Sequence, residues 1–319
     1  MISRLNVNKL FESIKFRTYM RLVTPYIVFS VLLVVGQIIS PGYLSPGHLQ
    51  SILVLAVPLG LMTIGETMVL LLGGNEIDIS VGDQASCAMV ISALLLQSHP
   101  LWLVILVILA QGLLFGALNG VGTRYLKIPA LIMTYITGRL LYGLSIAITK
   151  GTAPGIATKE VIELSSFPTI TIIWLLLSIV VIVILSKTVL GRCIYAIGDN
   201  PIAAHNSGIP MNLIAVIVYS LSGALGALSG LFLLGFILIP SRYGFASGYS
   251  LQAVVAAILG GVSAGRGNYI GAVGGVLVLT VLDSFFTIFN IPEAERMMLY
   301  GITLAIILLV YGRREKLRK

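Results

Sequence analysis

Long apolar runs separated by short polar segments dominate this sequence. The runs Leu22 to Ile39, Leu101 to Thr123 and Leu213 to Pro240 contain no charged residue. Each reaches the ~18 residues that a helix needs to cross the hydrocarbon core of a membrane. We therefore predict an all-α integral membrane protein with about ten transmembrane helices. The predicted spans cover residues 22–39, 49–72, 79–98, 101–123, 128–149, 167–186, 213–240, 248–264, 269–289 and 296–312.

Composition agrees with this pattern, because 57% of the 319 residues are hydrophobic and only 10% are charged. A soluble domain carries about 25% charged residues. The first apolar run follows some twenty polar and basic residues and lacks a small-residue cleavage site, so we expect a retained first span rather than a signal peptide. Cys87 and Cys193 have no partner at disulfide or metal spacing and are expected to be inert.

Basic residues are distributed unevenly over the predicted loops. The net charge of +8 is concentrated at the two ends of the chain, which favours cytoplasmic anchoring over nucleic-acid binding. Loops on the side of the termini also contain Arg124, Lys127, Lys187, Arg192 and Arg266, whereas the opposite loops contain Lys150, Lys159, Arg242 and Arg296. This asymmetry predicts that both termini are cytoplasmic. The expected organisation is a basic segment 1–21, a transmembrane domain 22–312 with a cytoplasmic loop 187–212, and a basic tail 313–319.

Two kinds of internal regularity occur. Small residues recur at every fourth position in three stripes, which predicts close helix packing. The stripes are Gly112, Gly116, Gly120; Ser222, Gly226, Gly230; and Gly267, Gly271, Gly275. Residues 73–79 and 247–251 also occupy similar places after the second and seventh spans, and Ile128-Pro129 is echoed by Ile291-Pro292. These echoes indicate an inverted repeat of spans 2–5 and 7–10, with coincidence among Gly, Pro and Leu as the alternative.

Motifs of catalysis are missing from the sequence. No Gly-x-x-x-x-Gly-Lys-Ser/Thr phosphate loop is present, so ATP bound in that manner must be hydrolysed on another chain. His48, His99 and His205 are isolated, without the spacing of a metal site. We predict no enzyme and no cofactor on this chain.

The longest polar interval, 187–212, contains the start and stop signals of a short helix. Asn200 suits the N-cap, Pro201 the first helical position, and Gly208 the C-terminal turn. An ordinary connecting helix is the interpretation that local physics alone favours. A small face around Ala203 and Ala204 nevertheless fits insertion into a groove of a partner protein.

Residues 191–209, from Gly191-Arg192-Cys193 to Ser207-Gly208-Ile209, resemble the cytoplasmic loop of ribose, xylose and autoinducer type ABC importer permeases. Residues 77–82, after Gly73-Gly74, and residues 259–267 resemble two further motifs of that family in the right order. The resemblance covers about residues 25–312. Glu66, Asp83 and Asp199 depart from the family pattern, which weakens any inference about the solute.

The resemblance implies a multi-pass permease subunit in a bacterial plasma membrane. Its expected partners are a second permease subunit, a cytoplasmic ABC ATPase that carries ATP and Mg²⁺, a periplasmic or lipoprotein solute-binding protein, and membrane lipid. The helix at 200–208 would be the ATPase-coupling helix. The residues expected to serve the coupling are Asn200, Pro201, Ala203, Ala204, Ser207 and Gly208.

Charged residues at membrane depth are the remaining candidates for function, because a charge at the centre of a span costs ~3 kcal/mol. Internal ion pairing, for instance of Arg139 with Glu66 or Asp83, is one explanation, and contact with the solute is the other. Pro58 and Gly248 are expected to interrupt helices, which would bring segments 73–83 and 240–251 toward the translocation path, one toward each side. The path candidates are Glu66, Asp78, Asp83, Arg139 and Tyr249.

The leading function is ATP-driven import of a small sugar or sugar-like solute. A secondary carrier that uses Glu66, Asp83 or Asp283 as an ion-coupling group is the alternative, and it would run on an ion gradient without an ATPase. A membrane scaffold without transport activity is the third possibility. The sequence does not distinguish pentose, hexose, furanose, polyol, autoinducer and nucleoside solutes, or homodimer from heterodimer.

Overall fold

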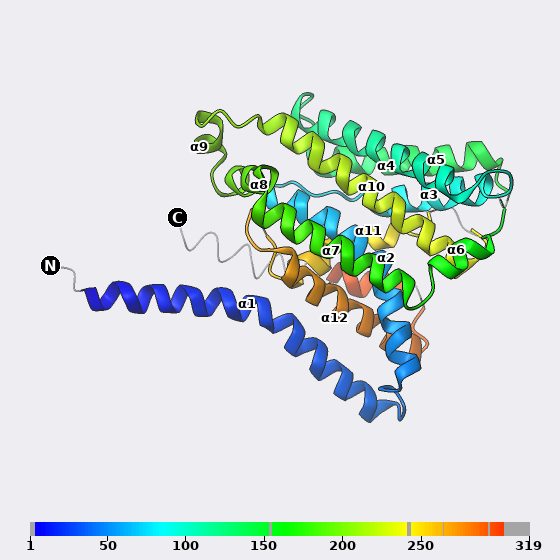
Figure 1. The fold of residues 1–319 in the computed structure, drawn as a ribbon, viewed down its shortest axis with the longest axis horizontal. Helices are drawn as coiled ribbons and strands as arrows, with labels where there is room; N and C mark the ends of the chain where they lie inside the picture. Colours follow the sequence, from blue (N-terminus) through cyan, green and yellow to red (C-terminus); the bar gives the residue numbers. More distant parts are fainter. Residues whose placement is uncertain (1–3, 153–154, 241–243, 264, 293, 303–319) are drawn as a thin grey trace.

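A computed structural model describes residues 4–152, 155–240, 244–263, 265–292 and 294–302. These residues form an all-helical bundle in which no named strand occurs (Figure 1). The helices are α1 (Arg4–Ile39), α2 (Pro46–Leu71), α3 (Val81–Leu95), α4 (Leu101–Arg124), α5 (Ala130–Thr149), α6 (Lys159–Leu164), α7 (Thr169–Lys187), α8 (Val189–Asp199), α9 (Pro201–Asn206), α10 (Met211–Ile237), α11 (Ser247–Leu259) and α12 (Tyr269–Ile288). The predicted all-α class is therefore confirmed.

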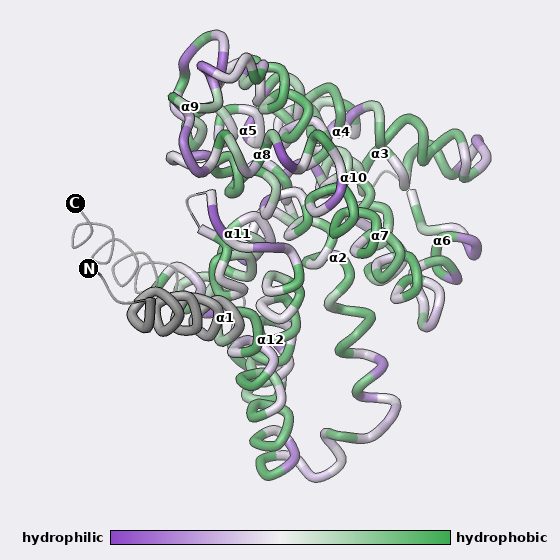
Figure 2. Tube along the Cα trace, turned by 60° about the vertical axis from the view of Figure 1, so that its left-hand side comes forward, coloured by the Kyte–Doolittle hydropathy of each residue, from purple (hydrophilic) through white to green (hydrophobic). Residues whose placement is uncertain are grey.

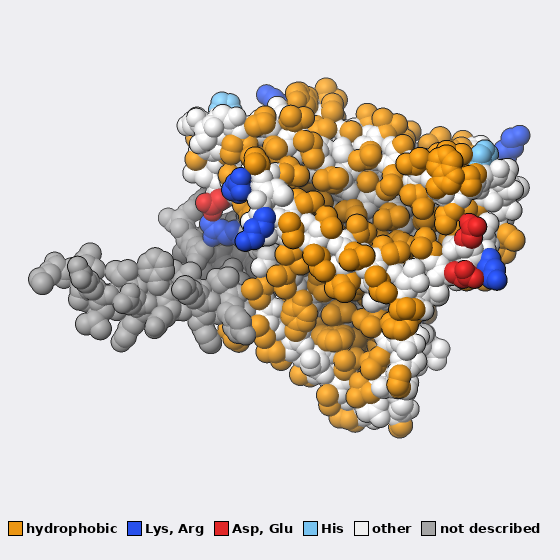
Figure 3. Space-filling view, viewed as in Figure 1, with side chains coloured by type: hydrophobic (Ala, Val, Ile, Leu, Met, Phe, Trp, Pro, Cys, Tyr) orange, Lys and Arg blue, Asp and Glu red, His pale blue; other side chains and the backbone are white. Residues whose placement is uncertain are grey.

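Seven helices in the described ranges are long and apolar enough to cross a membrane: the Leu22–Ile39 part of α1, and α2, α4, α5, α7, α10 and α12. Hydrophobic residues cover most of these helices, and hydrophilic ones gather near α9 and α6 (Figure 2). On the face in Figure 3, charged side chains lie at two ends, beside α8 and α9 and beside α6, with a hydrophobic surface between them. This arrangement is that of a multi-pass membrane protein.

Two of the expected spans are shorter than predicted. Over 79–98 and 248–264 the structure has α3, with 15 residues, and α11, with 13 residues. At 1.5 Å per residue these helices are about 20–22 Å long, less than the ~30 Å of a hydrocarbon core. Residues 73–80 before α3 are non-helical, as are residues 244–246 before α11. Since Gly73 and Gly74 have positive φ, the chain leaves α2 there and enters the bundle in a non-helical form.

The expected break at Pro58 is wrong, because α2 continues through this residue. Pro58 removes one donor from the helix, yet the surrounding α2 residues are buried and its carbonyl accepts a hydrogen bond from Ser229 of α10 at 3.0 Å. Tertiary packing thus supports the helix at this position. Gly248, the other expected breaker, lies within the first turn of α11.

Small residues hold the bundle together, as the stripes predicted. A Cβ on Gly112 would lie 2.7 Å from the Cα of Ala224, and one on Gly120 would lie 2.5 Å from the Cα of Val216. Real Cβ atoms are not found so close to other backbones, so α4 and α10 touch along their main chains. Gly230 packs in the same way against Ala85 of α3. One member of the third stripe differs, because Gly267 precedes α12 and has a φ of 116°.

The same pattern of helix contacts occurs twice in the bundle, when α2, α3 and α4 are matched with α10, α11 and α12. Helix α10 packs on α4 and α3, and α2 packs correspondingly on α12 and α11. Helix α3 contacts α4 as α11 contacts α12, and α2–α10 and α3–α11 pack across the middle. These contacts are those expected of two related units that begin at α2 and α10.

Parts of the chain ends lie outside the described residues. The tenth predicted span, 296–312, is helical as far as residue 302, and its remainder and the basic tail 313–319 lie outside the described ranges. At the other end, the helix of the first span begins at Arg4, within the expected basic segment 1–21. Arg242, counted among the loop charges, is also outside the described residues.

Candidate functional site

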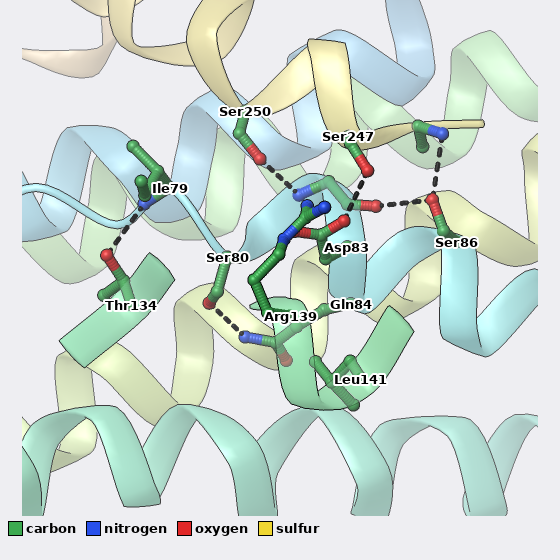
Figure 4. A network of polar contacts seen from close by, with 12 residues as sticks. Ile79, Ser80, Asp83, Gln84, Ser86, Thr134, Arg139, Leu141, Ser247 and Ser250 are labelled. Carbon is green, nitrogen blue, oxygen red and sulfur yellow. Dashed lines mark hydrogen bonds and ion pairs between the residues drawn. The ribbon is translucent and has the colours of Figure 1, made fainter. Parts of the chain in front are cut away.

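Helices α3 and α11 meet at their N-termini inside the bundle. The Gly82 N–H donates to the Ser250 Oγ at 2.9 Å, and the Ala246 N–H donates to the Ser86 Oγ at 2.9 Å (Figure 4). The start of each helix is therefore bound by a serine of the other helix. On each side, this serine lies four residues after the residue that donates its own N–H. Gly82 is required here, because a Cβ would contact the Ala246 carbonyl and lie 2.8 Å from the Ser250 Oγ.

This reciprocal pair corrects the register of the predicted repeat. The sequence echo matched residues 73–79 with 247–251, whereas the two hydrogen bonds are reciprocal when Gly82 is set against Ala246 and Ser86 against Ser250. The glycine echo also fails in detail, since Gly116 faces α10 and Gly271 faces the end of α11. The segments 73–83 and 240–251, both expected near the translocation path, touch each other through Gly82 and Asp83 on one side and Ser247 and Ser250 on the other.

Asp83 lies in the first turn of α3 and is the centre of this junction (Figure 4). Its Oδ2 is 2.7 Å from the Arg139 guanidinium of α5, and its Oδ1 accepts a hydrogen bond from the Ser247 Oγ of α11. A carboxylate is stabilised near a helix N-terminus, and the ion pair adds to this effect. Of the two acids considered for Arg139, the structure selects Asp83.

Arg139 connects the junction to the outer face of α5. Its side chain is 44% exposed while that of Asp83 is 5% exposed. The guanidinium lies 5.5 Å from the ring centroid of Tyr135 and 5.4 Å from that of Tyr142. Cation–π contacts of this kind stabilise Arg by about 0.5–2 kcal/mol. The residues Asp83, Arg139, Tyr135, Tyr142 and Ser247 are called the junction site below.

Glu66 and Asp78 belong to a different, fully buried network. Glu66 accepts the Asp78 N–H at 3.1 Å. Asp78 accepts from the Ser80 Oγ at 2.6 Å and from the Ser222 Oγ of α10 at 3.0 Å. Neither acid is exposed to any extent. These bonds anchor the segment 73–80 between α2 and α10. The ion pair of Arg139 is with Asp83 and not with either of these acids.

The other predicted residues are placed as follows. Tyr249 is in the first turn of α11, half-buried beside the junction site. Asp283 of α12 accepts a hydrogen bond from the Tyr300 hydroxyl. Ser86, Ser247 and Ser250 were not predicted as site residues. The pattern that could have indicated them is a serine in the first or second turn of a short apolar helix, after a segment that contains glycine.

Tyr135 and Tyr142 were also missed. They fall four residues before and three residues after Arg139, so all three share one face of α5. The Glu76 carboxylate, which accepts from the Tyr219 hydroxyl at 2.6 Å and pairs with Arg124 at 3.0 Å, was likewise not singled out. No group of three metal-ligating side chains occurs among the residues described.

Helix α9 confirms the start and stop signals predicted for a short helix. Asn200 is the N-cap and its Oδ1 accepts the Ala203 N–H at 3.0 Å, Pro201 is the first helical residue, and Gly208 has a φ of 74°. The two alanines differ, however, because Ala203 is exposed and Ala204 is 3% exposed.

The outward surface of α9 is formed mainly by other side chains. Ile202 is 75% exposed, and His205 and Asn206 are also exposed. Substitution of Ala204 by a large residue would therefore disturb the interior, and Ile202 and Ala203 are the better probes of this surface.

Comparison with known proteins agrees with these features. A family described as branched-chain amino acid transport system / permease component matches residues 48–308. The autoinducer 2 import system permease protein LsrC of Escherichia coli O9:H4 (strain HS) is 33% identical over 311 residues, which cover 94% of this chain and 89% of that protein. The protein of the same name from Salmonella paratyphi B is 32% identical over 300 residues, 89% of this chain and 85% of that protein.

No solved structure matches the chain. The family match nevertheless covers most of its length, and the relatives align over nearly all of it. Its apolar helices agree with the multi-pass membrane location of such proteins. The chain therefore belongs to the family of transmembrane permease subunits of ATP-binding-cassette importers.

Proposed function

We propose that this chain translocates a small sugar-like solute past the junction site of α3 and α11. The observation that carries the proposal is the meeting of two short helices inside a bundle of membrane spans, with an ion pair and serine hydroxyls at their N-termini. Non-helical backbone at membrane depth is tolerated where it is covered by protein or lines a water-filled cavity. Binding sites of membrane transporters are built from such interrupted helices.

Several features support a neutral, hydroxyl-rich solute. Asp83 and Arg139 offset each other's charge, and carboxylate, guanidinium and Ser247 together supply both donors and acceptors for hydroxyl groups. Tyr135 and Tyr142 provide flat apolar faces beside them. The relatives' name, autoinducer 2 import system permease, makes that solute one member of the proposed class. An external solute-binding protein would deliver the solute.

Energy enters through α9 in this proposal. The helix is capped, short and exposed, and it connects by a single residue, Asn200, to α8. It would dock with Ile202 and Ala203 in a groove of a separate cytoplasmic ATPase, to which ATP and Mg²⁺ bind. The buried carboxylates Glu66 and Asp78 accept hydrogen bonds within the chain, so they serve as anchors in this scheme rather than as ion-coupling groups.

The proposed topology has ten crossings, with α3 completed by residues 73–80 and α11 by the residues that precede it. Both termini, α9 and the loop after α11 would then be cytoplasmic, as the excess of basic residues on that side supports. The units α2–α5 and α10 to the tenth span would form an inverted repeat. A second permease subunit, identical or paralogous, would cover the Arg139 face of α5, because a half-exposed guanidinium is unfavourable against lipid.

Paired substitutions at the junction site test the proposed path. Asp83→Asn alone leaves Arg139 without its carboxylate, so reduced assembly is expected from this variant. The double variant Asp83→Asn with Arg139→Gln removes both charges together and is expected to assemble normally, yet to lose at least tenfold in solute uptake. Glu163→Gln, in the exposed pair with Lys159, is the control. Full uptake by the assembled double variant would exclude the junction site from the path.

A further inference from the structure

Three glycines from separate parts of the sequence meet where α8 crosses the end of α2. Gly198 is in the last turn of α8, Gly73 follows α2, and Gly265 lies in the loop after α11. A Cβ on Gly73 would lie 2.9 Å from the Cα of Gly198, and a Cβ on Gly198 would lie 2.6 Å from the Cα of Gly265. Real Cβ contacts are essentially never below 3.0 Å, so the three backbones touch directly. This contact is called the glycine joint below.

Polar contacts reinforce the glycine joint on both sides. The Gly265 N–H donates to the Leu70 carbonyl of α2 at 3.1 Å. The Tyr195 hydroxyl of α8 donates to the Gly267 carbonyl at 3.0 Å, and burial raises the pKa of this hydroxyl, so it remains a donor at neutral pH. Arg266 and Asp199 form an exposed pair at 3.4 Å. Helix α8 is thus bound to both the end of α2 and the loop after α11.

Both chain segments that leave the glycine joint lead to the junction site. From Gly73 the chain runs through the non-helical segment 74–80 into the first turn of α3, which contains Asp83. From the loop that contains Gly265, α11 leads back over about 20 Å to Ser247. On its other side the joint is the last turn of α8, which continues through Asn200 into α9. One point of contact therefore connects α9 with both halves of the junction site.

We infer that the glycine joint transmits displacement of α9 to the junction site, as a positioning element for transport; this rests on the coupling role proposed for α9. Side chains between two helices can change rotamer and absorb a small shift. Backbones in direct contact cannot, since the interior is close-packed and has no slack. The end of α2, the loop after α11 and α8 consequently move as one unit, and α3 and α11 move with it.

Gly198→Ala, in the complex with the ATPase and the binding protein reconstituted in proteoliposomes, tests this inference. The added methyl group must separate α8 from Gly265, whereas alanine is a good residue for the helix itself. We expect solute taken up per ATP hydrolysed to fall at least tenfold while the ATPase still co-purifies. Gly47→Ala, at a glycine with no atom within 4 Å of the added Cβ, should match the wild type. A Gly198→Ala complex that keeps its coupling within twofold of the wild type would overturn the inference.

Crosslinking provides a second test that does not depend on that variant. Asp199→Cys and Arg266→Cys place thiols at the exposed pair, in a background with Cys87→Ala and Cys193→Ser. A short bifunctional maleimide would then bind α8 covalently to the loop after α11. Because the joint moves as one unit, crosslinked complexes should retain uptake within twofold of uncrosslinked ones. Loss of uptake on crosslinking would show that the joint must open and would refute rigid transmission.

A parallel variant of α9 separates this inference from the proposed function. Ile202→Glu changes the exposed surface of α9 and leaves the glycine joint intact. If this variant retains full coupling and ATPase binding, the role of α9 itself is wrong. If Ile202→Glu uncouples or releases the ATPase while Gly198→Ala does not, α9 couples transport and only the joint is wrong.

Discussion

The same substitution, Gly→Ala, should have opposite effects on stability at two helical positions. Gly112 of α4 faces α10, where an added Cβ would contact the Gly223 carbonyl and lie 2.7 Å from the Ala224 Cα. Gly143 of α5 has no atom within 4 Å of an added Cβ. Alanine is favoured over glycine in a helix by about 1 kcal/mol. At Gly143 this gain is unopposed, so Gly143→Ala should be neutral to stabilising.

At Gly112 the obstacle is backbone, which cannot rotate away, so the helices must separate. Overpacking costs about 1–3 kcal/mol, and separation also weakens the contacts at Gly116 and Gly120 on the same face. The helix-propensity gain is the same in both variants, so Gly112→Ala should be less stable than Gly143→Ala by the overpacking cost, about 1–3 kcal/mol. At about 2–4 °C per kcal/mol, the apparent midpoints should differ by about 2–12 °C.

The assay is thermal unfolding of both purified variants in the same detergent, followed by size-exclusion chromatography of the protein that remains folded. Wild type provides the reference for both signs. Equal midpoints for the two variants, or a more stable Gly112→Ala, would refute the direct backbone packing of α4 against α10.

Three further predictions concern buried and exposed polar contacts. Ser250→Ala leaves the buried Gly82 N–H without its acceptor, so stability should fall by about 1–3 kcal/mol, whereas Ser51→Ala, at an exposed helical site, should change little in the same unfolding assay. Tyr269→Phe removes the hydroxyl that accepts from the Trp174 Nε1 at 3.0 Å, and should lower the midpoint by a few degrees and shift tryptophan emission; an unchanged spectrum would contradict the contact. Glu163→Gln should leave the midpoint unchanged, because its pair with Lys159 is exposed, and a clear loss would contradict this reasoning.

Hydropathy predicted the long spans well because it measures what lipid-facing helices need, which is an uninterrupted apolar surface. It failed at α3 and α11 because a non-helical segment such as Ile77 to Ser80, enclosed by other helices, is also partly apolar. The break is encoded by Gly73 and Gly74, whose positive φ values a hydropathy window does not detect.

Two parts of the candidate site were predictable: helix caps, which depend on neighbouring residues in the sequence, and the pairing of a charged residue that would be costly to leave unpaired in a membrane. The caps of α9 depend on Asn200, Pro201 and Gly208 alone, and a charge such as Arg139 must find a partner within the membrane. Arg139 pairs with Asp83 rather than with Glu66 because of the way α5 packs near α3, and this packing cannot be predicted from neighbouring residues in the sequence. The inward face of Ala204 was missed because a six-residue helix is too short to show a period.

The head-to-head arrangement of α3 and α11 also sets the electrostatics of the membrane interior. Each helix N-terminus contributes a positive potential equivalent to about half of an elementary charge, and the Asp83–Arg139 pair is neutral as a whole, so the potential at the junction is positive although its formal charge is zero. In a low-dielectric environment such a potential repels protons and sodium ions. An uncharged solute would pass this barrier while cations would not. The pathway could therefore open for the solute without a leak of cations that dissipates the membrane potential.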